Sequence, residues 1–338
     1  MKRLVWRGAE GLVLEHLPGP AAQPKENEVL LRMRAVGICG TDIHILKGAH
    51  PASHPPLVLG HEMAAEIAAV GKNVGNVREG DRVTVDSVVG CGRCPLCRRG
   101  STQFCVAGFE FGITRDGGCQ DYLIAPKRNV YRIPDAISFE EAAVLDMEVY
   151  RAASKCGVET GDTVLILGAG PIGLIACQIT SILGAGRVSL GDVLRSRLDA
   201  AEALGMADEY LAIPEAGFAE AGSEFDGKFD VVMDCAGTAA STKQAFGAAR
   251  PGGRVLLYGV HERPVHDVDM NHIVLKDLTV FGAQSDRNGW EEVIGLVTQG
   301  RLNLKKLITH TFPLEEGPRA FDLVRRREGG VIKAVLLV

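Results

Sequence analysis

Residues 163–192 read TVLILGAGPIGLIACQITSILGAGRVSLGD and divide into segments of different character. Thr163–Leu167 is a short apolar run of the kind that forms a buried strand. A glycine-rich turn, Gly168–Gly173, follows it and opens a helical pattern over Pro171–Leu183. The run Arg187–Leu190 reads as a second strand. A strand, a helix and another strand in this order predict a doubly wound parallel sheet with helices on both faces.

The glycine-rich turn has the GxGxxG spacing of a dinucleotide-binding motif. Its cofactor-binding residues are predicted to be Gly168, Gly170, Pro171, Ile172 and Gly173. Alone, this spacing is weak evidence and also fits a turn without a ligand, but here a strand precedes it and a helix follows it. The glycines let the backbone approach a pyrophosphate, whose charge is stabilised by the helix N-terminus.

Charged residues after the next strand bear on the choice of dinucleotide. Asp192 ends that strand, where a carboxylate accepts hydrogen bonds from the adenosine ribose and repels a 2′-phosphate. Arg195 and Arg197 follow it, and an arginine there can instead pair with a 2′-phosphate. Because the carboxylate lies at the strand end, we expect NAD to be preferred to NADP, with Arg197 among the cofactor-binding residues.

A short loop at residues 90–106 contains four cysteines: Cys91, Cys94, Cys97 and Cys105. CxxC spacings of this kind hold one tetrahedral metal ion, and four thiolates leave no open coordination position. We therefore predict a structural zinc site. Reactive or disulfide-forming thiols are the alternative, which the spacing disfavours.

The composition is typical of a globular protein of two domains. The chain has 338 residues, 46% hydrophobic and 23% charged, with a net charge of −5 and a pI near 6.0. This charge offers no binding surface for nucleic acid or anionic membranes. The N-terminus does not resemble a signal peptide, and no apolar stretch has the length of a membrane span. Nine cysteines, an odd number, indicate reduced thiols, so we expect a cytoplasmic protein.

The secondary-structure pattern changes along the chain and suggests the domain boundaries. Short strands dominate the first 130 residues, and strands alternate with helices after them. We expect further strands at 29–36, 63–70, 81–85, 229–234, 254–258, 278–281 and 331–337, and further helices at 139–154, 195–204 and 317–326. This predicts a β-rich domain at 1–150, a dinucleotide-binding domain at 151–285 and a C-terminal segment at 286–338 that returns to the first domain.

Two further motifs lie outside the cysteine loop and the glycine-rich turn. Cys39-Gly-Thr-Asp-Ile-His44 follows one predicted strand, and Gly60-His61-Glu62 opens the next. With these motifs and Gly80-Asp81-Arg82-Val83, the chain resembles the zinc-dependent medium-chain alcohol dehydrogenases from end to end. Within that family it is most similar to the polyol (sorbitol-like) and threonine dehydrogenases. The resemblance implies a GroES-like β-rich catalytic domain and a Rossmann domain.

The resemblance also implies a second, catalytic zinc ion. Cys39 and His61 would bind it, and Glu62 would be a third ligand or would contact one. Relatives carry another acid in the helix after the cysteine loop. Asp146 aligns best with that acid, although its side chain is one methylene shorter and Glu148 lies two residues further on.

The reaction implied by the resemblance is the oxidation of an alcohol by NAD. Thr41 would accept the hydroxyl proton, and His44 would pass it to solvent. We expect a small secondary alcohol as substrate, such as a polyol, cyclitol or sugar derivative, and its ketone as product. The alternatives are a threonine 3-dehydrogenase and a catalytically silent NAD-binding protein of the same fold. Relatives form homodimers or homotetramers, so one of these assemblies is expected.

Overall fold

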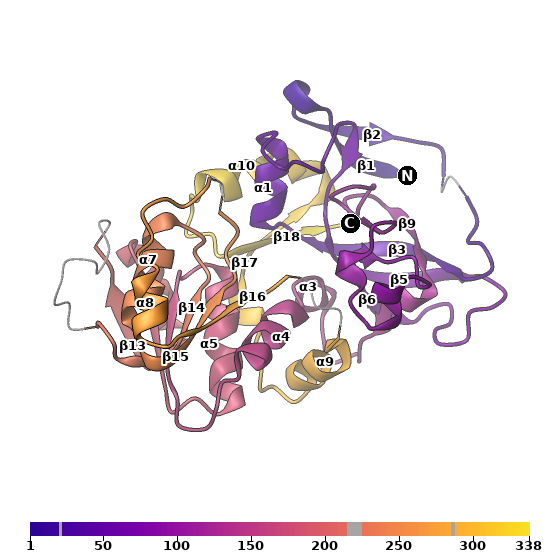
Figure 1. Cartoon of the computed structure of the whole chain (residues 1–338). Coiled ribbons are helices and arrows are strands. Elements are labelled where there is room, and N and C mark those ends of the chain that lie inside the picture. Colours follow the sequence, from indigo (N-terminus) through magenta and orange to yellow (C-terminus); the bar gives the residue numbers. More distant parts are fainter. Residues whose placement is uncertain (20–21, 215–224, 262, 285–287) are drawn as a thin grey trace. The chain divides into compact units, whose positions relative to one another are not determined.

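The computed structural model describes residues 1–19, 22–214, 225–261, 263–284 and 288–338, and the chain forms two compact units (Figure 1). Unit 1 contains Met1–Leu145, Trp290–Gly300 and Leu304–Val338. Unit 2 contains Asp146–Gly289 and Arg301–Asn303. Each unit has its own sheet and its own buried core. Within the described ranges, no helix is both long and apolar enough to cross a bilayer.

Unit 1 is rich in β-structure, and its main sheet has seven strands in the order β10-β6-β5-β3-β18-β17, with β9 also paired to β3. Smaller sheets, β2-β1-β4 and β7-β8, complete the unit. The strands are β1 (Lys2–Trp6), β2 (Leu12–His16), β3 (Glu28–Gly37), β4 (Leu57–Val58), β5 (Glu62–Val70), β6 (Arg82–Val85), β7 (Val88–Val89), β8 (Phe109–Glu110), β9 (Tyr122–Pro126), β10 (Val130–Arg132), β17 (Ile308–Pro313) and β18 (Lys333–Leu337). The helices are α1 (Gly40–Leu46), α2 (Pro95–Arg98), α3 (Phe139–Ala143), α9 (Trp290–Thr298) and α10 (Gly317–Arg326).

The register of the main sheet brings distant parts of the chain to one end. β3 and β5 are antiparallel, and Gly37 at the end of β3 lies opposite Glu62 at the start of β5. β18 is also antiparallel to β3, with Val335 opposite Gly37. Apolar side chains of these strands are almost fully buried, as at Met33 and Leu336, and this burial sets the register. The segment after β3 and the first residues of β5 and β18 therefore converge.

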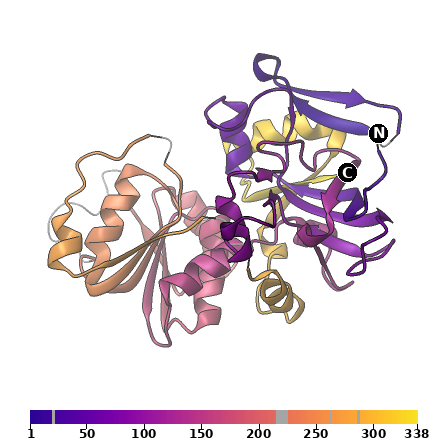
Figure 2. The same cartoon turned by 45° about the vertical axis from the view of Figure 1, so that its right-hand side comes forward.

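Unit 2 is a parallel sheet in the order β13-β12-β11-β14-β15-β16. Its strands are β11 (Thr163–Leu167), β12 (Arg187–Asp192), β13 (Glu209–Ala212), β14 (Phe229–Asp234), β15 (Ala249–Leu257) and β16 (Thr279–Gly282), and its helices are α4 (Met147–Cys156), α5 (Pro171–Leu183), α6 (Arg195–Ala203), α7 (Ala239–Ala248) and α8 (Asn271–Leu275). Helices lie on both sides of the sheet (Figure 2). The strand order switches direction between β11 and β14, where a sheet of this type offers a crevice to a dinucleotide. The predicted α/β class with a doubly wound sheet is confirmed.

One predicted helix is two helices in the structure. The segment 139–154 forms α3 and then α4, and the chain is extended between them at Asp146 (φ −119°, ψ 92°). Ser138 begins α3 as expected, in a capping box with Glu141. Asp146 begins α4, because its side chain accepts the Val149 N–H at 3.1 Å. Both α3 and α4 bury small and apolar residues. The apolar pattern of the sequence therefore runs on across Asp146, and the break between the helices is not visible in it.

Candidate active site and metal centres

The four cysteines of the loop at residues 90–106 lie close together in unit 1. All four sulfur atoms are within 4.8 Å of one another, with 4.0 Å between Cys91 Sγ and Cys97 Sγ. The other pair, Cys94 Sγ and Cys105 Sγ, is 3.9 Å apart. Tetrahedral zinc with Zn–S bonds of about 2.3 Å requires sulfur atoms about 3.8 Å apart. The donor set and its dimensions therefore fit one zinc ion with no open position.

Backbone amides support these sulfur atoms. Cys94 begins α2, and its Sγ accepts the Cys97 N–H at 3.4 Å. Cys105 Sγ accepts the Cys91 N–H at 3.3 Å. The N–H groups of Arg93 and Cys94 lower the pKa of the Cys91 thiol to about 6. Such bonds favour the thiolate, which is the form that binds a metal ion.

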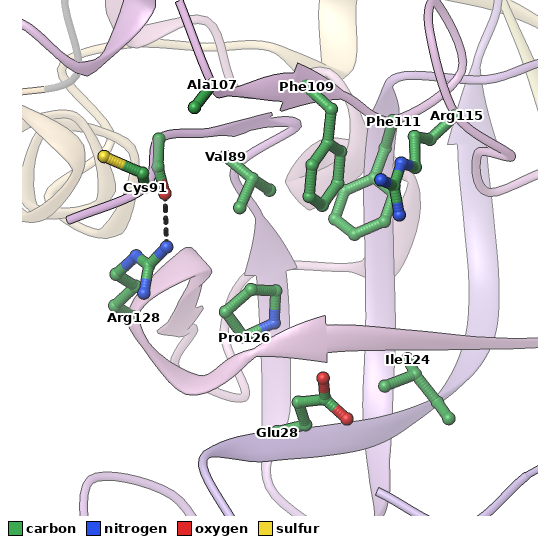
Figure 3. A pocket seen from close by; sticks show the side chains of 11 residues that line it. Glu28, Val89, Cys91, Ala107, Phe109, Phe111, Arg115, Ile124, Pro126 and Arg128 are labelled. Carbon is green, nitrogen blue, oxygen red and sulfur yellow. Dashed lines mark hydrogen bonds between the residues drawn. The ribbon is translucent and has the colours of Figure 1, made fainter. Parts of the chain in front are cut away.

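The side chain of Arg128 supports the cysteine loop from a neighbouring segment and donates a hydrogen bond to the carbonyl of Gly90 (Figure 3). Together with Phe109 and Glu28 it lines a pocket of about 350 Å³ beside the loop. The residues of the second metal cluster, described next, do not line this pocket. The pocket therefore belongs to the surroundings of the cysteine loop and not to the candidate active site.

A second cluster in unit 1 consists of Cys39, His61 and Glu62. Cys39 follows β3 and begins α1, whereas the other two lie at the start of β5, so the β3–β5 register brings them together. One potential ligand atom from each residue lies within 4.8 Å of the other two. Sulfur, imidazole nitrogen and carboxylate oxygen are donors that zinc accepts, and three protein ligands leave a position for a substrate.

Asp42 supports two members of this cluster. It is completely buried, and one carboxylate oxygen accepts the Cys39 N–H at 2.9 Å. The other oxygen lies 3.3 Å from Nδ1 of His61. Burial lowers the pKa of His61, but Asp42 and Cys39 raise it, so that this pKa lies well above its usual value. A contact of this kind fixes the ring and leaves the other ring nitrogen for a metal ion.

Lys333, at the start of β18, contacts the third member of the cluster and was missed by sequence analysis. Its Nζ donates to Glu62 Oε1 at 2.6 Å, and its side chain is only 8% exposed. The other oxygen, Glu62 Oε2, is buried without a hydrogen-bond partner among the described residues. A buried oxygen in this state is costly, and a metal ion held by the cluster would satisfy it. A lone lysine within the apolar run 331–337 was the available signal in the sequence.

Thr41 and His44 lie on α1, directly after Cys39. The hydroxyl oxygen of Thr41 is 3.8 Å from Cys39 Sγ, and His44 lies one turn further along the helix. His50 follows in the next loop, where burial lowers its pKa and the neighbouring His44 and His61 lower it further. The helix therefore carries a hydroxyl group beside the cluster, and two imidazoles follow it along the chain.

Asp146, the remaining predicted zinc ligand, belongs to unit 2. The structure shows it as the residue that begins α4, with one carboxylate oxygen engaged by the Val149 N–H. This contact explains the aspartate as a helix cap. Its contact with zinc stays a prediction.

The glycine-rich turn of unit 2 has the geometry that a dinucleotide requires. Gly168 has φ +106°, in the region that favours glycine. A Cβ at Gly173 would lie 1.8 Å from the Gly168 carbonyl oxygen, so only glycine lets α5 pack against the turn. At Gly170, which begins α5, a Cβ would meet no protein atom within 4 Å. Pro171 and Ile172 form the first turn of this helix, and an uncovered helix N-terminus of this kind is suited to a pyrophosphate.

Asp192 ends β12 beside this turn and is 7% exposed. One carboxylate oxygen accepts the Ala169 N–H at 2.7 Å, and the other accepts the Leu194 N–H at 2.8 Å. Nη1 of Arg197 lies 3.7 Å from Asp192 Oδ2. The carboxylate is thus fixed against the glycine-rich turn, and the arginine lies beside it as a counter-ion.

Comparison with known proteins shows similarity to dehydrogenases over the whole chain. Residues 25–135 match the alcohol dehydrogenase GroES-like domain, and residues 171–299 match the zinc-binding dehydrogenase family. The L-threonine 3-dehydrogenase of Bacillus licheniformis is 33% identical over 100% of this chain and 99% of its own. Galactitol-1-phosphate dehydrogenase from Escherichia coli has a similar structure (TM-score 0.89, 27% identity, 100% of both chains). So has a short chain alcohol dehydrogenase from Escherichia coli CFT073 complexed with NADH (TM-score 0.88, 31% identity, 100% of this chain and 99% of that one).

Fold, site and comparisons together define an oxidoreductase of the zinc-binding type that acts on CH–OH groups. The chain belongs to the zinc-dependent medium-chain alcohol dehydrogenase family. The GroES-like and Rossmann architecture implied by the resemblance is confirmed. The prediction of zinc and a nicotinamide dinucleotide as cofactors is confirmed at the level of the family.

Proposed function

We propose that this chain oxidises a secondary alcohol, such as a polyol, cyclitol or sugar derivative, with NAD as the hydride acceptor. The cluster of Cys39, His61 and Glu62, with its unsatisfied carboxylate oxygen, carries the proposal. Zinc bound by this cluster supplies a Lewis acid that makes the substrate hydroxyl more acidic. The four cysteines of the loop hold the second, structural zinc ion.

The residues around the cluster position the ligand atoms and move the proton. Asp42 holds the backbone of Cys39 and the ring of His61 in place. Thr41, next to Cys39, accepts the proton of the substrate hydroxyl. His44 lies on the same helix and passes that proton to solvent, because an imidazole can accept a proton at one ring nitrogen and release one from the other.

The substrate is the point on which two candidate functions differ. The threonine 3-dehydrogenase relative favours an amino alcohol, whereas the galactitol-1-phosphate dehydrogenase structure favours a polyol derivative. A panel of polyols, polyol phosphates, cyclitols and L-threonine, each with NAD, distinguishes them by NADH absorbance. Turnover of a polyol or cyclitol supports our proposal, and turnover of L-threonine alone supports the second candidate. A zinc-loaded protein that binds NADH but turns over no member of the panel would favour a silent binding protein.

The preference for NAD rests on Asp192, because its carboxylate lies where the adenosine ribose binds in this type of fold. Exchanging Asp192 for alanine is expected to weaken NADH binding roughly tenfold and NADPH binding less, which reduces the discrimination between them. Exchanging Arg197, the other predicted cofactor-binding residue here, for methionine is the comparison variant: because an arginine can pair with a 2′-phosphate, this change should weaken NADPH binding more than NADH binding, the opposite direction to Asp192→Ala. Binding titrations with both nucleotides measure the ratio, and an unchanged ratio in Asp192→Ala contradicts the assignment.

We also propose a cytoplasmic homo-oligomer. All nine cysteines lie in the described residues and none forms a disulfide, which supports a reducing compartment. β16 is an edge strand, and Val274, Leu275 and Val280 beside or on it are 73%, 81% and 37% exposed. An open edge with apolar neighbours favours pairing with a second copy. Light scattering tests this, since a Val280→Asp variant should shift toward the 36.0 kDa mass of one chain.

A further inference from the structure

A chain of buried polar groups lies at the end of β14 in unit 2. Asp234, the last residue of this strand, is completely buried. One of its carboxylate oxygens accepts the N–H groups of Ala236 and Gly237, each at 3.1 Å. The other oxygen accepts the hydroxyl of Thr242 at 2.9 Å, and Thr242 on α7 is itself only 5% exposed. The carboxylate therefore holds the loop after β14 by two contacts and connects it to α7 by a third.

His261, in the loop after β15, extends this chain. Its Nε2 lies 2.8 Å from the hydroxyl oxygen of Thr242. That hydroxyl has one proton, which we assign to the Asp234 carboxylate, because this acceptor is charged and, at 2.9 Å, closer than the Thr238 carbonyl at 3.2 Å. The contact with His261 is therefore made by Nε2–H donating to Thr242. This assigns the proton of the imidazole to Nε2.

The backbones of the same loops are in close contact. The main-chain oxygen of Asp234 accepts the N–H groups of Tyr258 and Gly259 at 3.0 and 2.9 Å. A Cβ at Gly237 would lie 2.7 Å from the carbonyl carbon of Gly259, so these two loops approach each other as only glycines allow. A Cβ at Gly168 of the glycine-rich turn would lie 3.1 Å from Ala236. The loops at 235–238 and 258–261 therefore pack together, and the first also packs on the glycine-rich turn.

The strand order indicates what these loops border. A doubly wound sheet is made of two mononucleotide-binding halves, and the dinucleotide crosses between them at the carboxyl ends of the strands. Asp192 and the glycine-rich turn belong to the half with β11, β12 and β13, which takes the adenosine and the pyrophosphate. The loops after β14 and β15 belong to the other half, which is left for the nicotinamide mononucleotide.

We propose that Asp234, Thr242 and His261 form a positioning chain that fixes these two loops for the nicotinamide half of the cofactor. The proposal rests on the dinucleotide function proposed above. Asp234 supplies a fixed, buried acceptor, and the hydroxyl of Thr242 on α7 donates to it. His261, in the second loop, donates to the same hydroxyl and so ties that loop to Asp234. Loss of one link frees a loop that must then be ordered by the cofactor, and this costs binding free energy. The three are positioning residues and are not assigned contact with the reacting atoms.

The test separates the two halves of the cofactor. Thr242→Val keeps the shape of the side chain and removes the hydroxyl, and Thr242→Ser restores it. NADH contains both halves, whereas ADP contains only the adenosine and the pyrophosphate. In calorimetric titrations of the full chain, Thr242→Val should weaken the binding of NADH roughly tenfold, which is the scale of one lost hydrogen bond. The affinity for ADP should change less than about twofold. Thr242→Ser should bind NADH within about twofold of the wild type.

A second variant and a melting curve distinguish a lost positioning contact from a general folding defect. His261→Leu breaks the last link at a partly exposed position and should reproduce the NADH loss with ADP again unchanged. Equal weakening of NADH and ADP in both variants, with a lower melting temperature, would show a merely structural role and overturn the proposal. Unchanged NADH binding in both variants would also overturn it. A wild type that binds neither NADH nor ADP would overturn the dinucleotide function as well.

Discussion

The two metal clusters of unit 1 are built in different ways. The cysteine loop draws all of its sulfur atoms from residues 91–105, and the loop's own backbone amides donate to them. The cluster of Cys39, His61 and Glu62 draws its atoms from the ends of two strands and is supported by Lys333, 271 residues from Glu62 in the chain. The first cluster depends on local conformation, whereas the second depends on the register of the whole sheet.

This difference also separates their chemistry. Four thiolates close the coordination sphere of a metal ion, so the cysteine loop can only stabilise the fold around it. The mixed set leaves a position open, and the hydroxyl of Thr41 and the imidazole of His44 lie on α1 after Cys39. We therefore expect loss of the first metal ion to affect stability, and loss of the second to affect turnover.

The largest expected effect is that of His61→Ala. It removes a ligand of the open cluster, so elemental analysis should fall from about two zinc ions per chain to about one. Turnover should fall on the order of 10³-fold or more, because the Lewis acid is lost, while NADH binding stays unchanged. His54→Ala, at an exposed position of the same unit, is the control. Substantial residual turnover with one zinc ion would contradict the assignment of the open cluster to catalysis.

The converse experiment is Cys97→Ser in the closed cluster. We expect loss of one zinc ion and a destabilisation of at least about 2 kcal/mol, which lowers the melting temperature by roughly 5 °C. Molecules that remain folded should keep most of their turnover per catalytic zinc. Cys156→Ala, a buried thiol outside both clusters, is the control. A variant with normal stability and no turnover would reverse the proposed roles of the two clusters.

The contrast explains which parts of the site could be predicted from the sequence. The cysteine loop and the glycine-rich turn were recognisable because each is a short continuous segment whose spacing encodes its geometry. Lys333 was not, because its contact with Glu62 exists only once β18 pairs with β3. The link from Asp234 through Thr242 to His261 was missed for the same reason, since it crosses from one βα unit to the next. For Asp146 the motif could not separate a helix cap from a metal ligand.

Lys333 tests whether the sheet supports the open cluster as we infer. Lys333→Met leaves the half-buried Glu62 without its cation and unpositioned, so zinc affinity at the open cluster should fall about 10- to 100-fold, as for other residues that orient metal ligands. Competition with a chelator measures this affinity, and zinc in the cysteine loop should be retained. Lys333→Arg keeps the charge and should recover most of the loss. Unchanged or tighter zinc binding in Lys333→Met would show that Lys333 does not position Glu62.

The smallest expected effect concerns Arg128, which supports the cysteine loop from outside it through a hydrogen bond to Gly90 (Figure 3). Because the side chain is exposed and the loop's own amides already hold the sulfur atoms, Arg128→Met should cost only about 1 kcal/mol. Zinc release to a chelator should then accelerate a few-fold from the closed cluster and not from the open one. Arg98→Met, an exposed arginine on the same loop, is the matched control for the lost charge. A loss of zinc as complete as in Cys97→Ser would show that the closed cluster also depends on the surrounding fold, and the contrast between the two clusters would then fail.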